Sequence, residues 1–215
     1  MSPDPTLTPA PVGPTIDFTQ PVVVVARQLL GAVLRLGDVA IRLTETEAYE
    51  GSGDPAAHAA RGLTPATAAL FGVPGSLYCF FSYGVHVCGN LVTGPPGSGS
   101  AVLLRAGDVV AGLEQARRRR WGPAGVTAPP RPDAWLAKGP GNLGRALGLT
   151  LAHAGWCSGS DFEVTGPAPQ AGAVIRRGPR VGVSVAHERP WRFWIDGAAS
   201  VSAYKKSPRA VPASW

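Results

Sequence analysis

The sequence predicts an α+β fold: a single compact domain in which antiparallel β-hairpins form a curved sheet flanked by short helices. Short segments of alternating apolar and polar residues recur along the chain. Glycine and proline, at 28 and 22 of 215 residues, interrupt it often. The length suits one sizeable core rather than two. We expect a disordered N-terminal tail over 1–16, the domain over 17–204 and a C-terminal tail over 205–215.

The first predicted element is a helix within residues 17–31. Thr19 can serve as its N-cap, Pro21 suits the first turn, and Gly31 can end it. Four consecutive valines oppose this assignment, because β-branched residues prefer strands.

The next element is a hairpin over 32–48, with its turn at Gly37 and the aspartate after it. Side chains two apart on a strand share a face. In the second arm of the hairpin, apolar positions are followed on one face by Glu45, Glu47 and Tyr49. An ordinary amphipathic strand keeps its apolar face apolar, so this strand leaves the core and enters a polar site.

The remaining elements follow from the same periodicities and from glycine and proline positions. The sequence predicts a hairpin over 75–93 with Tyr83 and Gly84 at its tip, a short buried strand over 99–110, a helix over 111–121, a loop over 122–135, a Gly-rich turn and short helix over 138–150, and strands over 173–186 and 191–197.

Composition excludes several classes of protein. No run approaches 18 apolar residues, and no secretion signal opens the chain, so we expect a soluble, intracellular protein, cytoplasmic and nucleoid-associated if bacterial. The three cysteines, Cys79, Cys88 and Cys157, are odd in number and lack CxxC spacing. We therefore expect buried thiols rather than a zinc site.

The net charge of +6 indicates a nucleic-acid partner, because its cations are mostly arginines, and lysine occurs only at positions 138, 205 and 206. The planar guanidinium group matches phosphate geometry. A high-GC coding bias, which favours arginine, alanine, glycine and proline, explains the same composition equally well.

Glu45 and Glu47 stand where one face of a strand leaves the core, and Arg105 ends an apolar strand segment. Glu45 could be a structural partner or a second charge of the pocket. Such residues could form a purely structural ion pair. Their company favours a ligand site, since one pocket could collect aromatic, histidine and amide side chains from the two hairpins: Tyr49, His58, Phe80, Tyr83 and Asn90. Together they suit a planar heterocyclic ligand.

These residues also form a recognisable series of motifs. "ETEAY" is followed after eight residues by His58, then by "PGSLYCFFSYGVHVCGN" and "AVLLRA". In this order and spacing they resemble the alkyladenine (3-methyladenine) DNA glycosylase family, over about Phe18 to Ser202. The resemblance implies a monofunctional enzyme that flips alkylated or deaminated purines out of double-stranded DNA: 3-methyladenine, 7-methylguanine, hypoxanthine and ethenoadenine. It would hydrolyse the N-glycosidic bond with a glutamate-activated water and leave an abasic site. It would act as a monomer, without metal or organic cofactor.

The resemblance also implies a role for each matching residue. Glu47 would be the general base that activates water, and Arg105 would hold that glutamate and its water. The others would handle the base: Tyr49 by stacking, His58 by packing and hydrogen bonding, Phe80 as the opposite wall, Asn90 by crowding the exocyclic amine of guanine, and Tyr83 as a wedge in the base stack.

The chain departs from the family pattern in two places. Phe80 stands where the family often has tyrosine, and Asn142 where it commonly has lysine, for which Lys138 could compensate. The run of arginines at 117–120 reads as a solvated helix end. A minor phosphate-binding role, which would show in salt dependence, is the alternative.

Two other functions stay open. A catalytically silent lesion-binding protein is disfavoured because Glu47 and Arg105 are both present. A hydrolase of free nucleosides would need neither the wedge Tyr83 nor the arginine excess.

Overall fold

The computed structural model describes residues 15–122, 131–159, 161–166 and 172–210. Residues 1–14 of the predicted N-terminal tail, 211–215 of the predicted C-terminal tail and 123–130 of the predicted loop therefore lie outside the described residues. Ile16 is only 9% exposed and packs into the core, so the described domain begins at this side chain.

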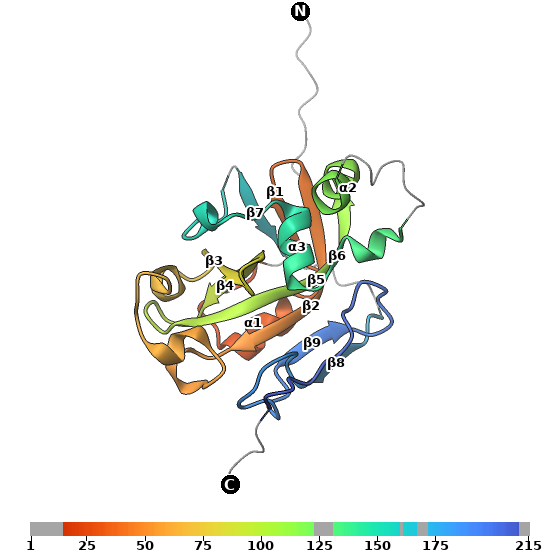
Figure 1. Ribbon diagram of the computed structural model, residues 1–215. Coiled ribbons are helices and arrows are strands. Elements are labelled where there is room, and N and C mark those ends of the chain that lie inside the picture. The colour runs from red at the N-terminus through yellow and green to blue at the C-terminus, as the bar shows by residue number, and fades with distance from the viewer. Residues whose placement is uncertain (1–14, 123–130, 160, 167–171, 211–215) are drawn as a thin grey trace, which may run out of the picture.

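An antiparallel sheet organises the fold (Figure 1), and its described strands are nine in number. They are β1 (Val33–Leu36), β2 (Val39–Tyr49), β3 (Leu77–Ser82), β4 (His86–Thr93), β5 (Ser100–Ala111), β6 (Ala137–Lys138), β7 (Phe162–Thr165), β8 (Ile175–Gly178) and β9 (Arg192–Ile195). The main path runs β3-β4-β5-β2-β1-β7; β6 adds to β5, and β9 joins β2 to β8. The predicted fold class is confirmed.

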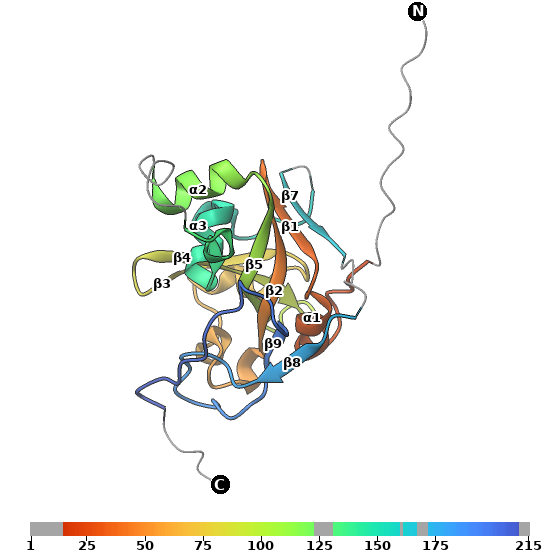
Figure 2. The same ribbon diagram turned by 90° about the vertical axis from the view of Figure 1, so that its right-hand side faces the viewer.

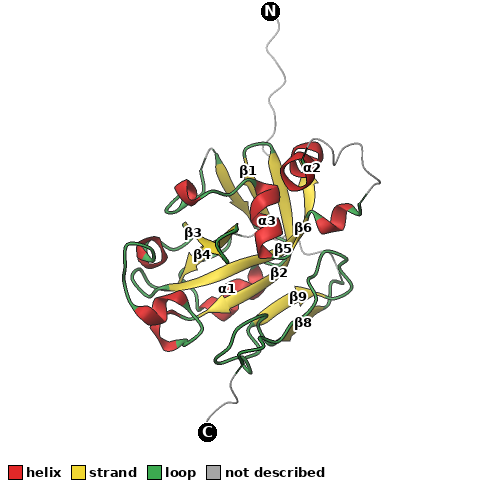
Figure 3. Ribbon diagram, viewed as in Figure 1, coloured by secondary structure: helices red, strands yellow, loops and turns green. Residues whose placement is uncertain are grey.

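Short helices surround the sheet (Figure 3). They are α1 (Val22–Gln28), α2 (Leu113–Trp121) and α3 (Pro140–Leu147), with single 3-10 turns at Gly51–Gly53, His58–Arg61, Ala68–Phe71, Asp133–Trp135 and Leu151–His153. In Figure 2, α2 and α3 lie on one side of the long strands β2 and β5, and α1 lies on the other. The main apolar core fills the space between these helices and the sheet.

Strand β2 places the functional site because it changes partners along its length. One edge pairs with β5 throughout, whereas the other pairs with β1 as far as Arg42 and with β9 from Glu45 onward. The β2–β5 register skips Thr44 on one strand and Arg105 on the other. Such bulges bend a strand and re-aim its side chains. The switch from core to polar residues thus coincides with this exchange of partners.

The start of α1 corrects the predicted cap. The helix begins at Val22, and Pro21 rather than Thr19 occupies the N-cap position. The Thr19 hydroxyl instead donates to the Asp17 carboxylate at 2.6 Å. The helix ends at Gln28, three residues before the glycine predicted to stop it. Its valines are tolerated because tertiary packing of an apolar face outweighs helix propensity.

Two predicted strands differ from those observed. The strand described as short within 99–110 instead occupies almost that whole segment as the twelve-residue β5, with which β4, β2 and β6 all pair. The strand expected over 173–186 ends as β8 at Gly178. Beyond it the chain turns inward as a loop, because Arg180 is buried beneath the pocket.

The arginines at the end of α2 are less solvated than predicted. Arg119 donates to the carbonyl of Leu147 at 2.7 Å, so it caps the end of α3. Arg120 donates to the carbonyl of Leu136 at 2.7 Å. Arg118 alone among the four is classed as exposed. The predicted solvated run is therefore wrong for the residues that hold α2 against its neighbours.

Candidate functional site

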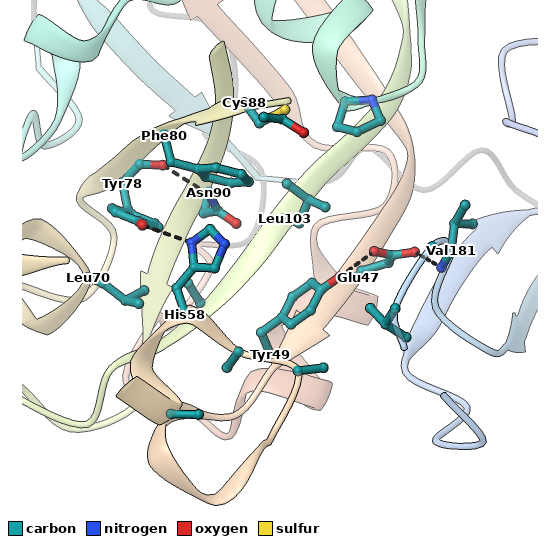
Figure 4. A pocket seen from close by; sticks show the side chains of 18 of the residues that line it. Glu47, Tyr49, His58, Leu70, Tyr78, Phe80, Cys88, Asn90, Leu103 and Val181 are labelled. Atoms are coloured by element: carbon teal, nitrogen blue, oxygen red, sulfur yellow. Dashed lines mark hydrogen bonds between the residues drawn. The ribbon is translucent and has the colours of Figure 1, made fainter. Parts of the chain in front are cut away.

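The seven residues singled out in the sequence all line one cavity of about 560 Å³ (Figure 4). Strand β2, the 3-10 turn at His58–Arg61, the β3–β4 hairpin, strand β5 and the loop over 181–185 enclose it. The seven are Glu47, Tyr49, His58, Phe80, Tyr83, Asn90 and Arg105. The structure thus brings all seven side chains to one cavity, and the roles expected of them stay predictions.

Glu47 presents a fully buried carboxylate to this cavity. Its Oε1 accepts the backbone N–H of Val181 at 2.7 Å and lies 3.3 Å from a guanidinium nitrogen of Arg105. Its Oε2 accepts the hydroxyl of Tyr49 at 2.9 Å. Two hydrogen bonds, both drawn in Figure 4, and one ion pair, made by groups from three segments, therefore fix the orientation of one carboxylate.

The two side-chain partners of Glu47, Tyr49 and Arg105, both keep their protons in this site. Burial, followed by the Glu47 charge, raises the pKa of Tyr49 well above its ordinary value, so the phenol keeps its proton and donates it. Burial opposes the charge of Arg105, but the carboxylates of Glu47 and Glu45 outweigh it and raise the pKa of Arg105.

Glu45 lies outside the cavity lining, although it is as buried as Glu47. Its Oε1 accepts Nε of Arg105 at 2.8 Å and Nε of Arg192 at 2.6 Å. Ser202 adds its backbone N–H to Oε2 at 2.8 Å and its hydroxyl to Oε1 at 2.9 Å. Glu45 is therefore the anchor of Arg105, whose other edge remains available to Glu47.

An aromatic cluster forms the opposite wall. The His58 ring packs edge-on against Phe80, with centroids 4.5 Å apart, and its Nδ1 lies 2.9 Å from the Tyr78 hydroxyl. Tyr78 and Phe80 stack at 5.8 Å. Burial, with a smaller effect of the Arg61 charge, lowers the pKa of His58, which favours the neutral ring.

Asn90 and Cys88 complete this wall from β4. The Asn90 amide donates to the Tyr78 carbonyl at 3.1 Å and is only 5% exposed, so its orientation is set by the paired strand β3. Burial raises the pKa of the Cys88 thiol to about 11, so it lines the cavity as a neutral group.

Tyr83 projects from the tip of the β3–β4 hairpin and is 92% exposed. Both Tyr83 and Gly84 adopt positive φ, 51° and 67°, and Val85 N–H donates to the Ser82 carbonyl at 3.2 Å. This is the geometry of a two-residue type I′ turn. A tyrosine held in the left-handed region is strained, and such strain concentrates at functional sites.

The suggested compensation by Lys138 stays a prediction. Its ammonium group donates to the Ala199 carbonyl at 3.0 Å, and the amide of Asn142 donates to the Lys138 carbonyl at 2.7 Å. Both side chains are thus engaged within the fold.

Sequence reasoning missed several residues of the site. Tyr78 could have been found, because it stands two positions before Phe80 and shares its face of the strand. Val181 contributes a backbone group, and Arg192 and Ser202 reach the site through Glu45. No local pattern marks these three, because their contacts join segments more than 130 residues apart.

In the described ranges no group of three or more His, Cys, Asp or Glu side chains is placed to hold a metal ion. Over the same ranges, no helix is both long and apolar enough to cross a membrane.

Comparison with known proteins identifies a family for this sequence. Residues 16–199 match the family model described as methylpurine-DNA glycosylase. A protein of Nocardia farcinica is 50% identical over 199 residues, which cover 88% of this chain and 90% of the relative. A protein of Frankia casuarinae is 48% identical over 200 residues, covering 87% and 91%. Both carry the provisional name 3-methyladenine DNA glycosylase.

Proposed function

Because the chain belongs to the methylpurine-DNA glycosylase family, we propose that it removes alkylated or deaminated purines from double-stranded DNA by a single hydrolytic step. Membership makes the chain a DNA N-glycosylase, a hydrolase of DNA repair. The substrates proposed are 3-methyladenine, 7-methylguanine, hypoxanthine and ethenoadenine. The observation that supports this most is the buried Glu47 carboxylate, held by two hydrogen bonds and an ion pair at the wall of an aromatic pocket.

The first step is extrusion of the damaged nucleotide. A base inside a duplex cannot be reached at its sugar bond, and flipping it costs about a few kcal/mol. Tyr83, exposed on a rigid turn, fills the space that the base vacates and offsets part of this cost. Tyr49 on one side and Phe80 on the other receive the base, where aromatic stacking contributes roughly 1–3 kcal/mol per base.

Asn90, in the pocket wall, excludes normal guanine by steric contact. Asn90 is fixed by its bond to the neighbouring strand, so it cannot move away from a ligand at little cost. We propose that it crowds the exocyclic amine of normal guanine. His58, held by Tyr78, presents its free ring edge to the base.

Bond cleavage then proceeds through an oxocarbenium-like sugar. The electron pair of the glycosidic bond leaves with the base and neutralises the positive charge of an alkylated purine. Glu47 stabilises the sugar cation. It also accepts a proton from the attacking water while the water oxygen bonds to the anomeric carbon. Arg105 positions this glutamate. No lysine lines the pocket, so a Schiff base and strand cleavage are not expected.

The test uses two labelled duplexes, one with a single hypoxanthine and one with ethenoadenine, incubated with wild type and Glu47→Gln. Breaks at the lesion that appear only after hot alkali, and only with wild type, support a monofunctional glycosylase. Breaks before alkali contradict it. Tight lesion binding without breaks, also on a methylated duplex, indicates the silent binder. Release of base from free deoxyinosine at a rate equal to the duplex rate indicates a nucleoside hydrolase. Sedimentation of the enzyme with one duplex tests the proposed monomer.

A further inference from the structure

A second buried ion pair lies directly behind the pocket. Arg180 stands in the loop between β8 and β9, and no part of its side chain is exposed. Its guanidinium group binds both carboxylate oxygens of Asp54, which is equally buried. The same group donates to the backbone carbonyls of Ala48 at 3.1 Å and Ala186 at 3.2 Å.

The pair joins three segments that carry pocket residues. Ala48 stands on β2 between the two pocket residues of that strand. Asp54 belongs to the loop that leads to His58, and it also accepts the backbone N–H groups of Glu50 and Ala56, at 3.3 and 3.2 Å. The third segment follows Arg180 itself, because the next residue supplies the backbone N–H that Glu47 accepts.

Arg180 is also one layer of a stack of cations and rings. Its guanidinium carbon lies 4.6 Å from the ring centroid of Tyr49 and 5.3 Å from that of Trp191. Arg189 covers Trp191 in turn, at 4.6 Å. A planar cation held over an aromatic face fixes the ring beneath it. The stack therefore backs the ring of Tyr49, the residue that lines the cavity.

Stability alone does not account for this pair. Taking two charges out of water is costly. Replacing a buried ion pair by well-packed apolar residues of similar volume often leaves stability unchanged or increases it. What apolar residues cannot reproduce is the forked geometry that binds one carboxylate and two carbonyls at once. The pair is therefore better explained by the way it fixes the positions of the three segments than by its contribution to stability.

We propose that Arg180, held by Asp54, is a positioning residue of the base pocket. It presents the ring of Tyr49 for stacking and places the Val181 N–H against Glu47. Neither residue of the pair touches the substrate. This inference rests on the proposed glycosylase function for its kinetic consequence, but its structural part can be measured without substrate.

The test compares Asp54→Asn and Arg180→Lys with wild type. The first keeps side-chain shape and removes a charge, and the second keeps the charge and removes the fork. Leu34→Ala serves as the control, since Leu34 is fully buried in β1 away from the cavity and its loss lowers thermal stability by another route. Three quantities are measured well below each melting temperature: the single-turnover cleavage rate at saturating enzyme, affinity for an abasic duplex, and hydrogen exchange at the Val181 amide.

We expect both pair variants to lose at least tenfold in the saturating rate, to keep abasic-duplex affinity within threefold, and to lose exchange protection at Val181. The Leu34→Ala control should keep the rate and the protection. Pair variants with lowered melting temperatures but unchanged rate and Val181 protection would overturn the inference. If wild type cleaves no damaged duplex, the proposed function fails, whereas Val181 exchange still decides whether the pair positions the loop.

Discussion

Glu45 and Glu47 are both buried, but their different partners indicate a structural role for Glu45 and a catalytic role for Glu47. Glu45 serves Arg105, Arg192 and Ser202 and does not line the cavity, whereas Glu47 does. The substitution Glu45→Gln should therefore reduce stability far more than Glu47→Gln, and Glu47→Gln should reduce cleavage far more than it reduces stability.

The size of the stability loss follows from the contacts of Glu45. Its amide variant leaves Arg192, whose side chain is 5% exposed, without a counter-charge, and leaves Arg105, 7% exposed, with Glu47 as its remaining carboxylate. Breaking a buried pair in this way costs about 3–5 kcal/mol. If the amide oxygen of Gln accepts the hydrogen bonds from the two arginines, the amide nitrogen faces the backbone N–H of Ser202. This N–H then has no acceptor, which costs about 1–3 kcal/mol more. About 5 kcal/mol corresponds to a melting temperature roughly 10–20 °C lower for a domain of this size.

Glu47→Gln preserves more of its contacts. The amide oxygen can still accept the Val181 N–H, and the amide nitrogen can donate to the Tyr49 oxygen. Its fold should therefore survive. The loss of a general base should lower the single-turnover rate about 10²–10⁴-fold.

The assay pairs thermal unfolding followed by circular dichroism with cleavage of a hypoxanthine duplex. Asp133→Asn is the surface control, because its partner Arg117 is solvent-accessible and exposed ion pairs contribute little to stability. A Glu45→Gln protein that melts with wild type, beside a strongly destabilised Glu47→Gln protein that still cleaves, would refute the division of roles.

Three further predictions concern the wedge, the pocket histidine and the helix end. Tyr83→Ala should leave melting unchanged, because the side chain is exposed, but weaken lesion binding by about 1–3 kcal/mol in a fluorescence titration; equal affinity would count against the wedge. The pKa of His58 is lowered, so its neutral form stabilises the fold above about pH 6.5 and this stability is lost as pH falls through the folded pKa. His58→Gln should flatten the fall in melting temperature between pH 7 and 5, more than His153→Gln, whose pKa is lowered in the same direction; identical profiles would contradict this. Arg119→Ala should cost about 2 kcal/mol, since its charged group binds two carbonyls, whereas Arg118→Ala should be neutral in the same unfolding measurement.

Much of the pocket was accessible from local sequence. Two-residue periodicity placed Glu47 and Tyr49 on one face of a strand, and the hydrogen bond between them agrees. The pair Tyr83–Gly84 between alternating segments predicted a tight turn, and both residues adopt the positive φ that this turn requires. These features depend on neighbours within a few residues, and so they can be seen without a fold.

Other features could not be predicted in this way. The length of β5 depends on three strands that pair with it, and the end of β8 at Gly178 depends on the burial of Arg180. For both strands a contact made elsewhere in the chain outweighed the local preference. The cap expected at Thr19 failed for a local reason instead, because its hydroxyl donates to the carboxylate of Asp17, two residues earlier.

The sequence by itself determined the fold class and the hairpins, because these follow from periodicity and turn chemistry, and its motifs pointed to Glu47 and the other pocket side chains through the family resemblance. Periodicity left Glu45 and Glu47 equivalent, and only the tertiary structure decided which of them faces the cavity and what holds it there. Glu45 and Glu47 are indistinguishable as strand residues two apart. They are told apart by Ser202 and Val181, which arrive from distant segments and bind one carboxylate each. Contacts between distant segments cannot be inferred from local patterns, because no periodicity links the residues that make them.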